Sequence, residues 1–221
     1  MCGRFYVPEG DLDDFAGLVS KIEKELLKKA GEVSPGDYAP VITPGLLGIN
    51  TNDISTEITA DAVHAVKWGF PVLKGRPIIN ARSETVKDKP MFKLPYAKRR
   101  CLVPARGFFE WKDIDKSMVE KNELKDARKK RIKHYISYID STMMYLAGLY
   151  WFFKDNDGIQ RPYFTILTTQ ANEDIRAIHD RMPVIIKNDN KEIWLNERNI
   201  ERIDPLLKPL EQGLLSVKVT D

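Results

Sequence analysis

From Val63 to Ile186 the chain is divided into short apolar or β-branched segments with proline or glycine near their ends. Segments of this length and composition are typical of β-strands. They do not alternate regularly with helical patterns, so a parallel sheet built from βαβ units is not expected. The sequence therefore predicts an α+β domain with a mainly antiparallel, barrel-like sheet and flanking helices. The expected strands are Val66–Phe70, Pro77–Asn80, Cys101–Pro104, Phe108–Trp111, Met143–Phe152, Tyr163–Thr169 and Val184–Ile186.

Three other segments have helical spacing. Apolar residues recur at helical intervals over Leu12–Leu27, with acidic residues toward the start and lysines at the end, as the helix dipole favours. Shorter helices are expected at Asn172–Ile178 and around Lys191–Asn196. The segment Asp113–Lys133 is rich in charge and lacks an apolar stripe. We interpret it as an exposed insertion, helical in part, within a single domain that spans residues 1–221.

The composition narrows the class of protein. At 221 residues and 43% apolar, the chain suits one domain with a sizeable core. No apolar run approaches the ~18 residues of a membrane span, and the N-terminus has no signal segment. With Cys2 and Cys101 as the only cysteines, a disulfide framework is not expected, which indicates a reducing cytoplasm. The cysteines and three histidines lack metal-ligand spacing, so we expect neither metal nor cofactor.

The first residues carry unusual chemistry. Cys2 follows Met1 directly, and cysteine is small enough for methionine removal, which would leave an amine and a thiol on adjacent carbons. Such an aminothiol can condense with an aldehyde to a thiazolidine, or act as an N-terminal nucleophile with its own amine as base. The plain alternative is a buried structural cysteine. Gly3 leaves space beside a nucleophile and Arg4 could hold an anionic substrate, and both favour an active site.

The net charge of +3, from 35 basic and 32 acidic residues, does not by itself indicate a nucleic-acid-binding protein. Charge runs usually form solvated faces, so each basic cluster alone favours an ordinary surface. The two clusters are Lys98-Arg99-Arg100 and Arg128-Lys129-Lys130-Arg131 with Lys133.

Three further polar residues are candidates for chemistry. Glu110 interrupts an aromatic strand; burial would raise its pKa and suit it to proton transfer, whereas strand alternation could instead point it to solvent. His179 follows a helical turn and could shuttle protons or cap the helix. Asn80 ends an apolar strand and could orient a nucleophile or belong to a turn.

Together these segments resemble the SRAP family (SOS-response-associated peptidase fold). The motifs occur in the family's order and span nearly the whole chain. The departures are Arg106, at a position often occupied by a small polar residue or an acidic one, and the charged insertion. The matching motifs are Met1-Cys2-Gly3-Arg4-Phe5, Trp68-Gly69, Asn80-Ala81-Arg82-Ser83-Glu84-Thr85, Cys101-Leu102-Val103-Pro104, Gly107-Phe108-Phe109-Glu110-Trp111 and Ile178-His179-Asp180-Arg181-Met182-Pro183-Val184.

The resemblance implies a sensor and covalent shield for abasic sites in single-stranded DNA. It implies that the Cys2 amine attacks the open-chain aldehyde and that the sulfur closes a thiazolidine. Asn80 would position Cys2, Glu110 would assist proton transfer, and His179 would act as acid or base on the sugar oxygen. The family's peptidase label implies self-removal of residues before the cysteine, here Met1 alone.

The resemblance also implies the partner and its contacts. Arg4 and Arg82 would hold phosphates beside the lesion. Trp68 would stack on a base or act as a wedge at a junction of single strand and duplex, with core packing as the alternative. We expect a monomer that needs no cofactor, makes no membrane contact, and associates with the nucleoid when bound to DNA.

Two other functions remain open at this stage. An N-terminal-nucleophile amidohydrolase of the glutamine amidotransferase type also begins Met-Cys-Gly, although the later glutamine-holding motifs are not found here. A reader of modified cytosine in duplex DNA would need the pocket residues but no reactive cysteine. The Asn80-Ala81-Arg82 and Glu110-Trp111 segments fit SRAP better than the amidohydrolase.

Overall fold

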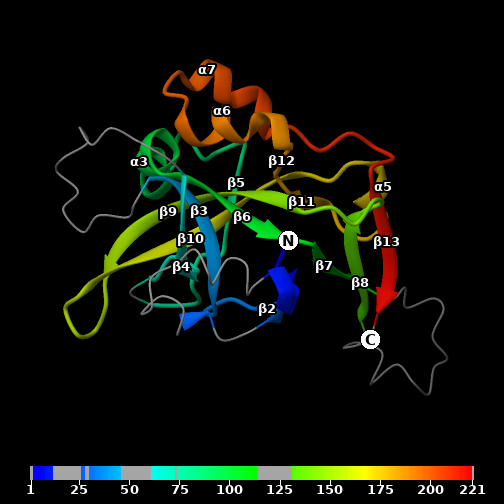
Figure 1. Cartoon of the computed structure of the whole chain (residues 1–221), viewed down its shortest axis with the longest axis horizontal. Coiled ribbons are helices and arrows are strands. Elements are labelled where there is room, and N and C mark those ends of the chain that lie inside the picture. The colour runs from blue at the N-terminus through cyan, green and yellow to red at the C-terminus, as the bar shows by residue number, and fades with distance from the viewer. Residues whose placement is uncertain are drawn as a thin grey trace.

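A computed structural model of the chain describes residues 2–11, 26–27, 30–45, 61–72, 74–113 and 131–220. Most of the helix expected over Leu12–Leu27 lies outside these residues, as does most of the Asp113–Lys133 segment. Within the described residues, no helix is long and apolar enough to cross a membrane. Two β-structures, a closed barrel and an open sheet, make up most of the fold (Figure 1).

The barrel closes through five strands. β3 pairs with β4 and β6, β6 pairs with β9, β9 pairs with β10, and β10 returns to β4. Every pairing is antiparallel except β10 with β4, which is parallel. Closure removes the free strand edges that an open sheet would expose. The five strands are β3 (Tyr38–Pro44), β4 (Asp61–Trp68), β6 (Arg100–Ala105), β9 (Met144–Lys154) and β10 (Gln160–Gln170).

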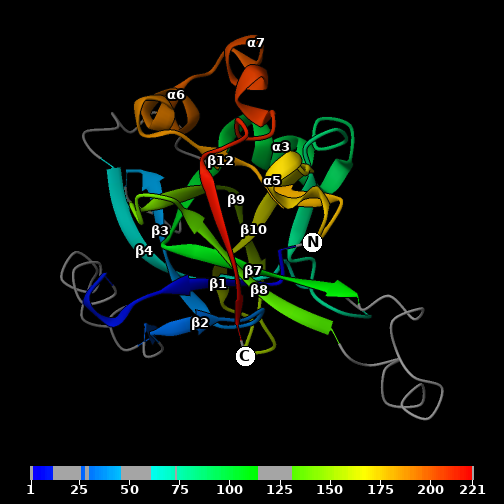
Figure 2. The ribbon, with the colours of Figure 1, turned by 90° about the vertical axis from the view of Figure 1, so that its right-hand side faces the viewer.

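The open sheet is antiparallel throughout, in the order β13-β8-β7-β1-β2. Figure 2 shows its strands crossing the molecule beside the barrel. In β1 the side chains alternate, so that Phe5 and Val7 are buried in the core while Arg4 and Tyr6 are not. Its strands are β1 (Arg4–Val7), β2 (Gly31–Val33), β7 (Gly107–Asp113), β8 (Arg131–Tyr138) and β13 (Leu215–Thr220).

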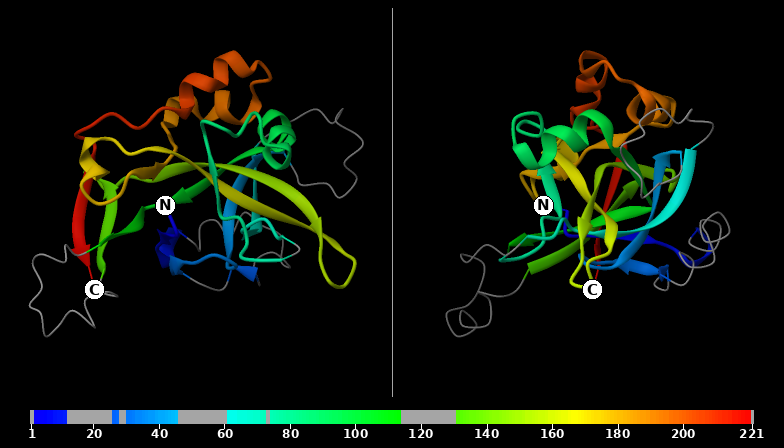
Figure 3. Two further views of the ribbon diagram at one scale, coloured as in Figure 1. Left: turned by 180° about the vertical axis from the view of Figure 1, so that it is seen from behind. Right: turned by 90° about the vertical axis from the view of Figure 1, so that its left-hand side faces the viewer.

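Short elements extend the barrel. β5 and β11 pair with β10, and β12 pairs with β9. The β9–β10 hairpin continues as a long curved ribbon to one side, visible from behind in Figure 3. Helices α6 and α7 lie together above one end of the barrel (Figures 1 and 2). These elements are β5 (Asn80–Arg82), α3 (Pro90–Lys98), α5 (Glu173–Arg176), β11 (Arg181–Pro183), β12 (Ile185–Ile186), η2 (Asn188–Asn190), α6 (Lys191–Asn196), α7 (Ile200–Ile203) and η3 (Asp204–Leu207).

β6 is buried at all six positions, because one core cluster covers one of its faces and a second, which includes helical residues, covers the other. Its first residue, Arg100, is 2% exposed. The guanidinium donates to the carbonyl oxygens of Tyr96, Ala97, Trp194 and Glu197, at the C-terminal ends of α3 and α6. The basic cluster at residues 98–100 is therefore not a uniform solvated face.

The predicted fold class is confirmed. The strands expected at 101–104, 108–111, 143–152 and 163–169 coincide with β6, β7, β9 and β10, and α6 begins and ends as expected. The strand expected over Pro77–Asn80 is reduced to one bridge, between Ile78 and Phe70, before β5 begins. The helix expected over Asn172–Ile178 is shorter, because α5 covers only Glu173–Arg176.

Candidate functional site

Cys2 lies two residues before the start of β1 and has no exposed surface. Its thiol lies 3.6 Å from the carbonyl oxygen of Arg4. Burial raises the pKa of the Cys2 thiol well above its ordinary value, and the charge of Glu110 raises it further. The sulfur is therefore a neutral thiol at neutral pH.

Asn80 holds Cys2 from a different part of the fold. It begins β5, whose pairing with β10 is parallel and brings Asn80 opposite Ile166. From there its side-chain amide nitrogen, Nδ2, donates to the Cys2 carbonyl oxygen at 2.9 Å. Its amide oxygen, Oδ1, is buried and has no hydrogen-bond partner among the described residues. Asn80 thus fixes the backbone of the residue that carries the thiol.

Glu110 lies in β7 and is 2% exposed. Strand alternation directs it to the same face of the sheet as the fully buried Phe108. Burial raises the pKa of the Glu110 carboxyl, while the positive charges of the amino terminus and of His179 act against the rise. A carboxyl in this environment keeps its proton to higher pH than an exposed glutamate does.

His179 lies between α5 and β11, with a side chain 28% exposed. The backbone N–H of Arg181 donates to its Nδ1 at 2.9 Å. A carboxylate oxygen of Asp180 lies 2.8 Å from the same nitrogen. These contacts hold the His179 ring in place just before β11.

These four residues come from four separate segments and meet at one place. A hydrogen bond joins Asn80 to Cys2, the charge of Glu110 acts on the Cys2 thiol, and the charge of His179 acts on Glu110. The structure thus brings together all four residues predicted to be catalytic. Among the described residues, no group of three or more His, Cys, Asp or Glu side chains could hold a metal ion.

The two predicted phosphate-binding arginines differ in their surroundings. Arg4 donates to Glu32 at 2.9 Å and lies 5.5 Å above the ring of Trp111. Its side chain is 43% exposed. Arg82 ends β5, two residues beyond Asn80, and is exposed. Arg82 therefore presents a cation on the strand that also carries Asn80.

A sequence model of the family described as SOS response associated peptidase (SRAP) matches residues 1–221. The chain belongs to the SRAP family. It is 32% identical over 219 residues to "Abasic site processing protein YoaM" of Bacillus subtilis, covering 96% of this chain and 87% of that protein. It is 26% identical over 203 residues to "Abasic site processing protein YedK" of Escherichia coli, covering 89% and 80%. A solved structure from Bacteroides thetaiotaomicron matches with a TM-score of 0.75 and 25% identity, over 100% of this chain and 92% of that one.

In this SRAP chain Trp68 is a core residue. Its side chain has no exposed surface, and its ring stacks on Phe164 with centroids 6.0 Å apart. Its Nε1 donates to the carbonyl oxygen of Ile79 at 3.0 Å. The contact with DNA expected for Trp68 is not compatible with this burial, so the alternative of core packing is the correct one.

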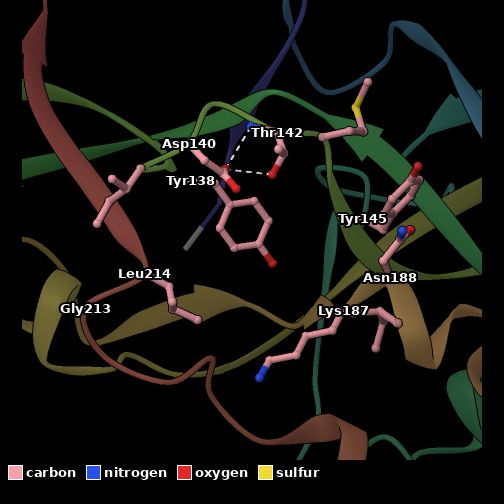
Figure 4. Close-up of a pocket in the computed structure, with 11 residues that line it drawn as sticks. Tyr138, Asp140, Thr142, Tyr145, Lys187, Asn188, Gly213 and Leu214 are labelled. Atoms are coloured by element: carbon pink, nitrogen blue, oxygen red, sulfur yellow. Dashed lines mark hydrogen bonds between the residues drawn. The ribbon is translucent and has the colours of Figure 1, made fainter.

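A separate hollow of about 690 Å³ lies away from the SRAP motifs (Figure 4). One side is lined by Tyr138, at the end of β8, and by Leu214, directly before β13. Another side is lined by Tyr145, Lys187 and Asn188. None of the predicted site residues contributes to it. The residues predicted to be catalytic therefore lie where β1, β5, β7 and the α5–β11 loop meet, and not in this hollow.

Sequence reasoning did not single out the residues that support this site. Arg181 donates to both carboxylate oxygens of Glu84, at 2.5 and 2.9 Å, and to the carbonyl oxygen of Thr168. It thereby ties the segment that follows His179 to the turn that follows Arg82. The sequence marked both residues, because Arg181 and Glu84 lie in the SRAP motifs. Their pairing could not be predicted, because it depends on the fold.

Proposed function

We propose that this protein recognises abasic sites in single-stranded DNA and shields them with a covalent bond to Cys2. The observation that carries the proposal is the meeting of Cys2, Asn80, Glu110 and His179 at one place. The names of the SRAP relatives, which call them abasic site processing proteins, agree with it. Removal of Met1, by the chain itself or by a methionine aminopeptidase, would give Cys2 the α-amine that the reaction needs.

The reaction is an addition followed by a ring closure. An α-amine has an ordinary pKa of about 7.7–8.0, so a substantial fraction is neutral at physiological pH. Its nitrogen attacks the aldehyde carbon of the opened sugar to form a carbinolamine, which loses water to give an imine. The Cys2 sulfur then bonds to the imine carbon, and the thiol proton passes to the nitrogen. The resulting thiazolidine holds the strand without further cleavage.

The surrounding residues have matching roles in the proposal. Glu110, with its raised pKa, donates the proton that lets the carbinolamine hydroxyl leave as water. His179 accepts or donates a proton at the sugar oxygen as the ring opens. Asn80 keeps the Cys2 backbone in place, and Arg4 and Arg82 hold phosphates on either side of the lesion.

The amidohydrolase alternative has less support in the sequence, because the Asn80-Ala81-Arg82 and Glu110-Trp111 segments fit SRAP better. With Met1 still in place, burial and the charge of Glu110 raise the pKa of the Cys2 thiol.

The test is adduct formation with uracil-excised single-stranded DNA, read on a denaturing gel. Protein lacking Met1, verified by intact mass, is expected to give a heat-stable adduct. Cys2→Ser should leave at most a labile imine, because its oxygen does not close a stable ring. Cys101→Ser, at the other buried cysteine, is the matched control and should behave as wild type. No adduct with processed wild type, or a heat-stable one with Cys2→Ser, would refute the mechanism.

A further inference from the structure

His134 lies beside Glu110 in the open sheet and has no role in the function proposed above. In the register of β7 and β8, Glu110 is paired directly with His134, and Phe108 with Ile136. Directly opposed residues share one face of the sheet, with Cβ atoms about 4.5–5.5 Å apart. His134 therefore belongs to the same row of side chains as the buried carboxyl.

This row leads from the core to solvent. Glu110 is 2% exposed, His134 is 8% exposed, and Val219, which is paired with His134 from β13, is 70% exposed. In the adjoining row, Phe108 and Ile136 are fully buried. His134 thus lies between the buried Glu110 carboxyl and the solvent-exposed edge of the sheet.

The hydrogen bonding of His134 fixes its tautomer. Its Nδ1 lies 3.0 Å from the carbonyl oxygen of Ile132, which can only accept. Nδ1 therefore carries the hydrogen, and Nε2 of the neutral ring holds a lone pair. Within the described part of the chain, the Ile132 carbonyl is the one hydrogen-bond partner of this ring. Nε2 is the nitrogen that can take up a proton.

We propose that His134 is a positioning residue that carries protons between water and Glu110. The inference rests on the function proposed above. When Glu110 protonates the departing hydroxyl of the carbinolamine, it is left as a buried carboxylate. His134 takes a proton from water at Nε2, passes it to that carboxylate, and returns to the neutral ring. The same route, run backwards, lets Glu110 lose a proton when the link is reversed.

The neighbouring lysine of β8 does not face this row. Lys133 precedes His134 on β8 but lies on the opposite face, where its ammonium lies 4.7 Å from the centroid of the Phe109 ring and bonds to Glu32. The titratable group paired with His134 is Glu110 on β7, and Glu110 interacts in turn with Cys2 before β1 and with His179 before β11.

The experiment measures the rates of adduct formation and release with abasic single-stranded DNA, with and without added imidazole. His134→Ala is expected to slow the steps that need Glu110 to regain its proton by on the order of 10²-fold, the lower end of the range for general acid–base catalysis. Free imidazole should restore the rate, because the variant leaves a space of its size. His134→Phe fills that space, so it should be slow and should not respond to imidazole.

His64→Ala is the matched control, because His64 is a histidine of similar burial, 6% exposed, placed in the barrel strand β4. The His64→Ala protein should form and release the adduct at the wild-type rates, and added imidazole should not change those rates. A wild-type rate for His134→Ala, or a loss that imidazole does not restore in a variant that melts as a folded protein, overturns the relay. Wild type that forms no adduct overturns the proposed function as well, which separates the two failures.

Discussion

The acidity of Glu110 depends on the strand that carries it. In β7 the residues alternate between faces, and Glu110 shares its face with Phe108 in the core. Both neighbours in sequence, Phe109 and Trp111, point to the other face. Burial then raises the pKa of the carboxyl, so the group that suits acid catalysis also costs stability when it ionises.

Replacing Glu110 with Gln is therefore expected to separate stability from function. In wild type the pKa of the folded-state Glu110 carboxyl is raised above the ordinary 4.5. The stability that this carboxyl contributes is fully present below pH 4.5 and is lost as pH rises through the folded-state pKa. Glu110→Gln lacks this loss. Its free energy of unfolding, from urea titrations, should gain on that of wild type over this window by about 1.4 kcal/mol for each unit by which the pKa is raised.

The same variant should form adducts far more slowly, by about 10²-fold or more, because an amide donates no proton to the leaving hydroxyl. Glu201→Gln, at an exposed position on α7, is the control, and its stability should follow wild type across the same pH range. A Glu110→Gln protein that loses stability relative to wild type as pH rises would contradict the assigned direction of the pKa shift.

At the scale of elements, a few residues decide how strands and helices approach. Gly107 begins β7, and a Cβ there would lie 2.5 Å from both the Ile136 carbonyl oxygen and the Tyr135 ring. Only glycine permits β7 to approach β8 so closely, which gives the glycine of the Gly107–Trp111 motif a structural reason. Arg100 has the equivalent role for the helices, because its guanidinium accounts for four carbonyl oxygens at two helix ends.

Arg100→Met should therefore destabilise the protein strongly. Burial lowers the Arg100 pKa to about 10, so the side chain remains charged at neutral pH and favours the negative ends of α3 and α6. Methionine would fill much of the space but leave the carbonyl groups without donors. We expect a loss of about 3–5 kcal/mol in the free energy of unfolding, measured in urea.

Lys98→Met, two residues earlier and exposed, is the control and should change stability by no more than about 0.5 kcal/mol. A loss below about 1 kcal/mol for Arg100→Met would mean that water replaces the guanidinium at these carbonyl groups. The helical layer would then not depend on Arg100.

For the whole molecule, local patterns predicted the strands well and their assembly poorly. The barrel strands β6, β9 and β10 were expected because their apolar runs are bounded by proline or glycine, whereas β3 was not among the expected strands and β4 was expected only in its last residues. α3 was missed because Pro95 lies inside it and interrupts a helical pattern. β8 was missed because it directly follows the charged segment that obscures its start. The roles proposed for Asn80, Glu110 and His179 come from the family resemblance. Their approach to Cys2 depends on pairings between distant strands, which no local pattern contains.

Net charge also acts at this scale, and here it is small. At +3 the protein has little general attraction for DNA, so its affinity must come from particular cations near the site. Arg82 is exposed beside Asn80, whereas Arg4 already donates to the Glu32 carboxylate. A phosphate contact at Arg4 has to compete with that carboxylate, so Arg82 is expected to contribute more to DNA binding.

Arg82→Ala should therefore weaken binding to undamaged single-stranded DNA at every sequence tested. For one lost phosphate contact, the slope of log K against log salt should fall by about 0.7 in magnitude, measured by fluorescence anisotropy. Arg202→Ala is the control, because Arg202 lies on α7 and pairs with Glu197 in the helical layer above the barrel (Figure 1). An unchanged slope for Arg82→Ala would remove Arg82 from the phosphate contacts and leave Arg4 as the cation that must exchange its carboxylate partner for DNA.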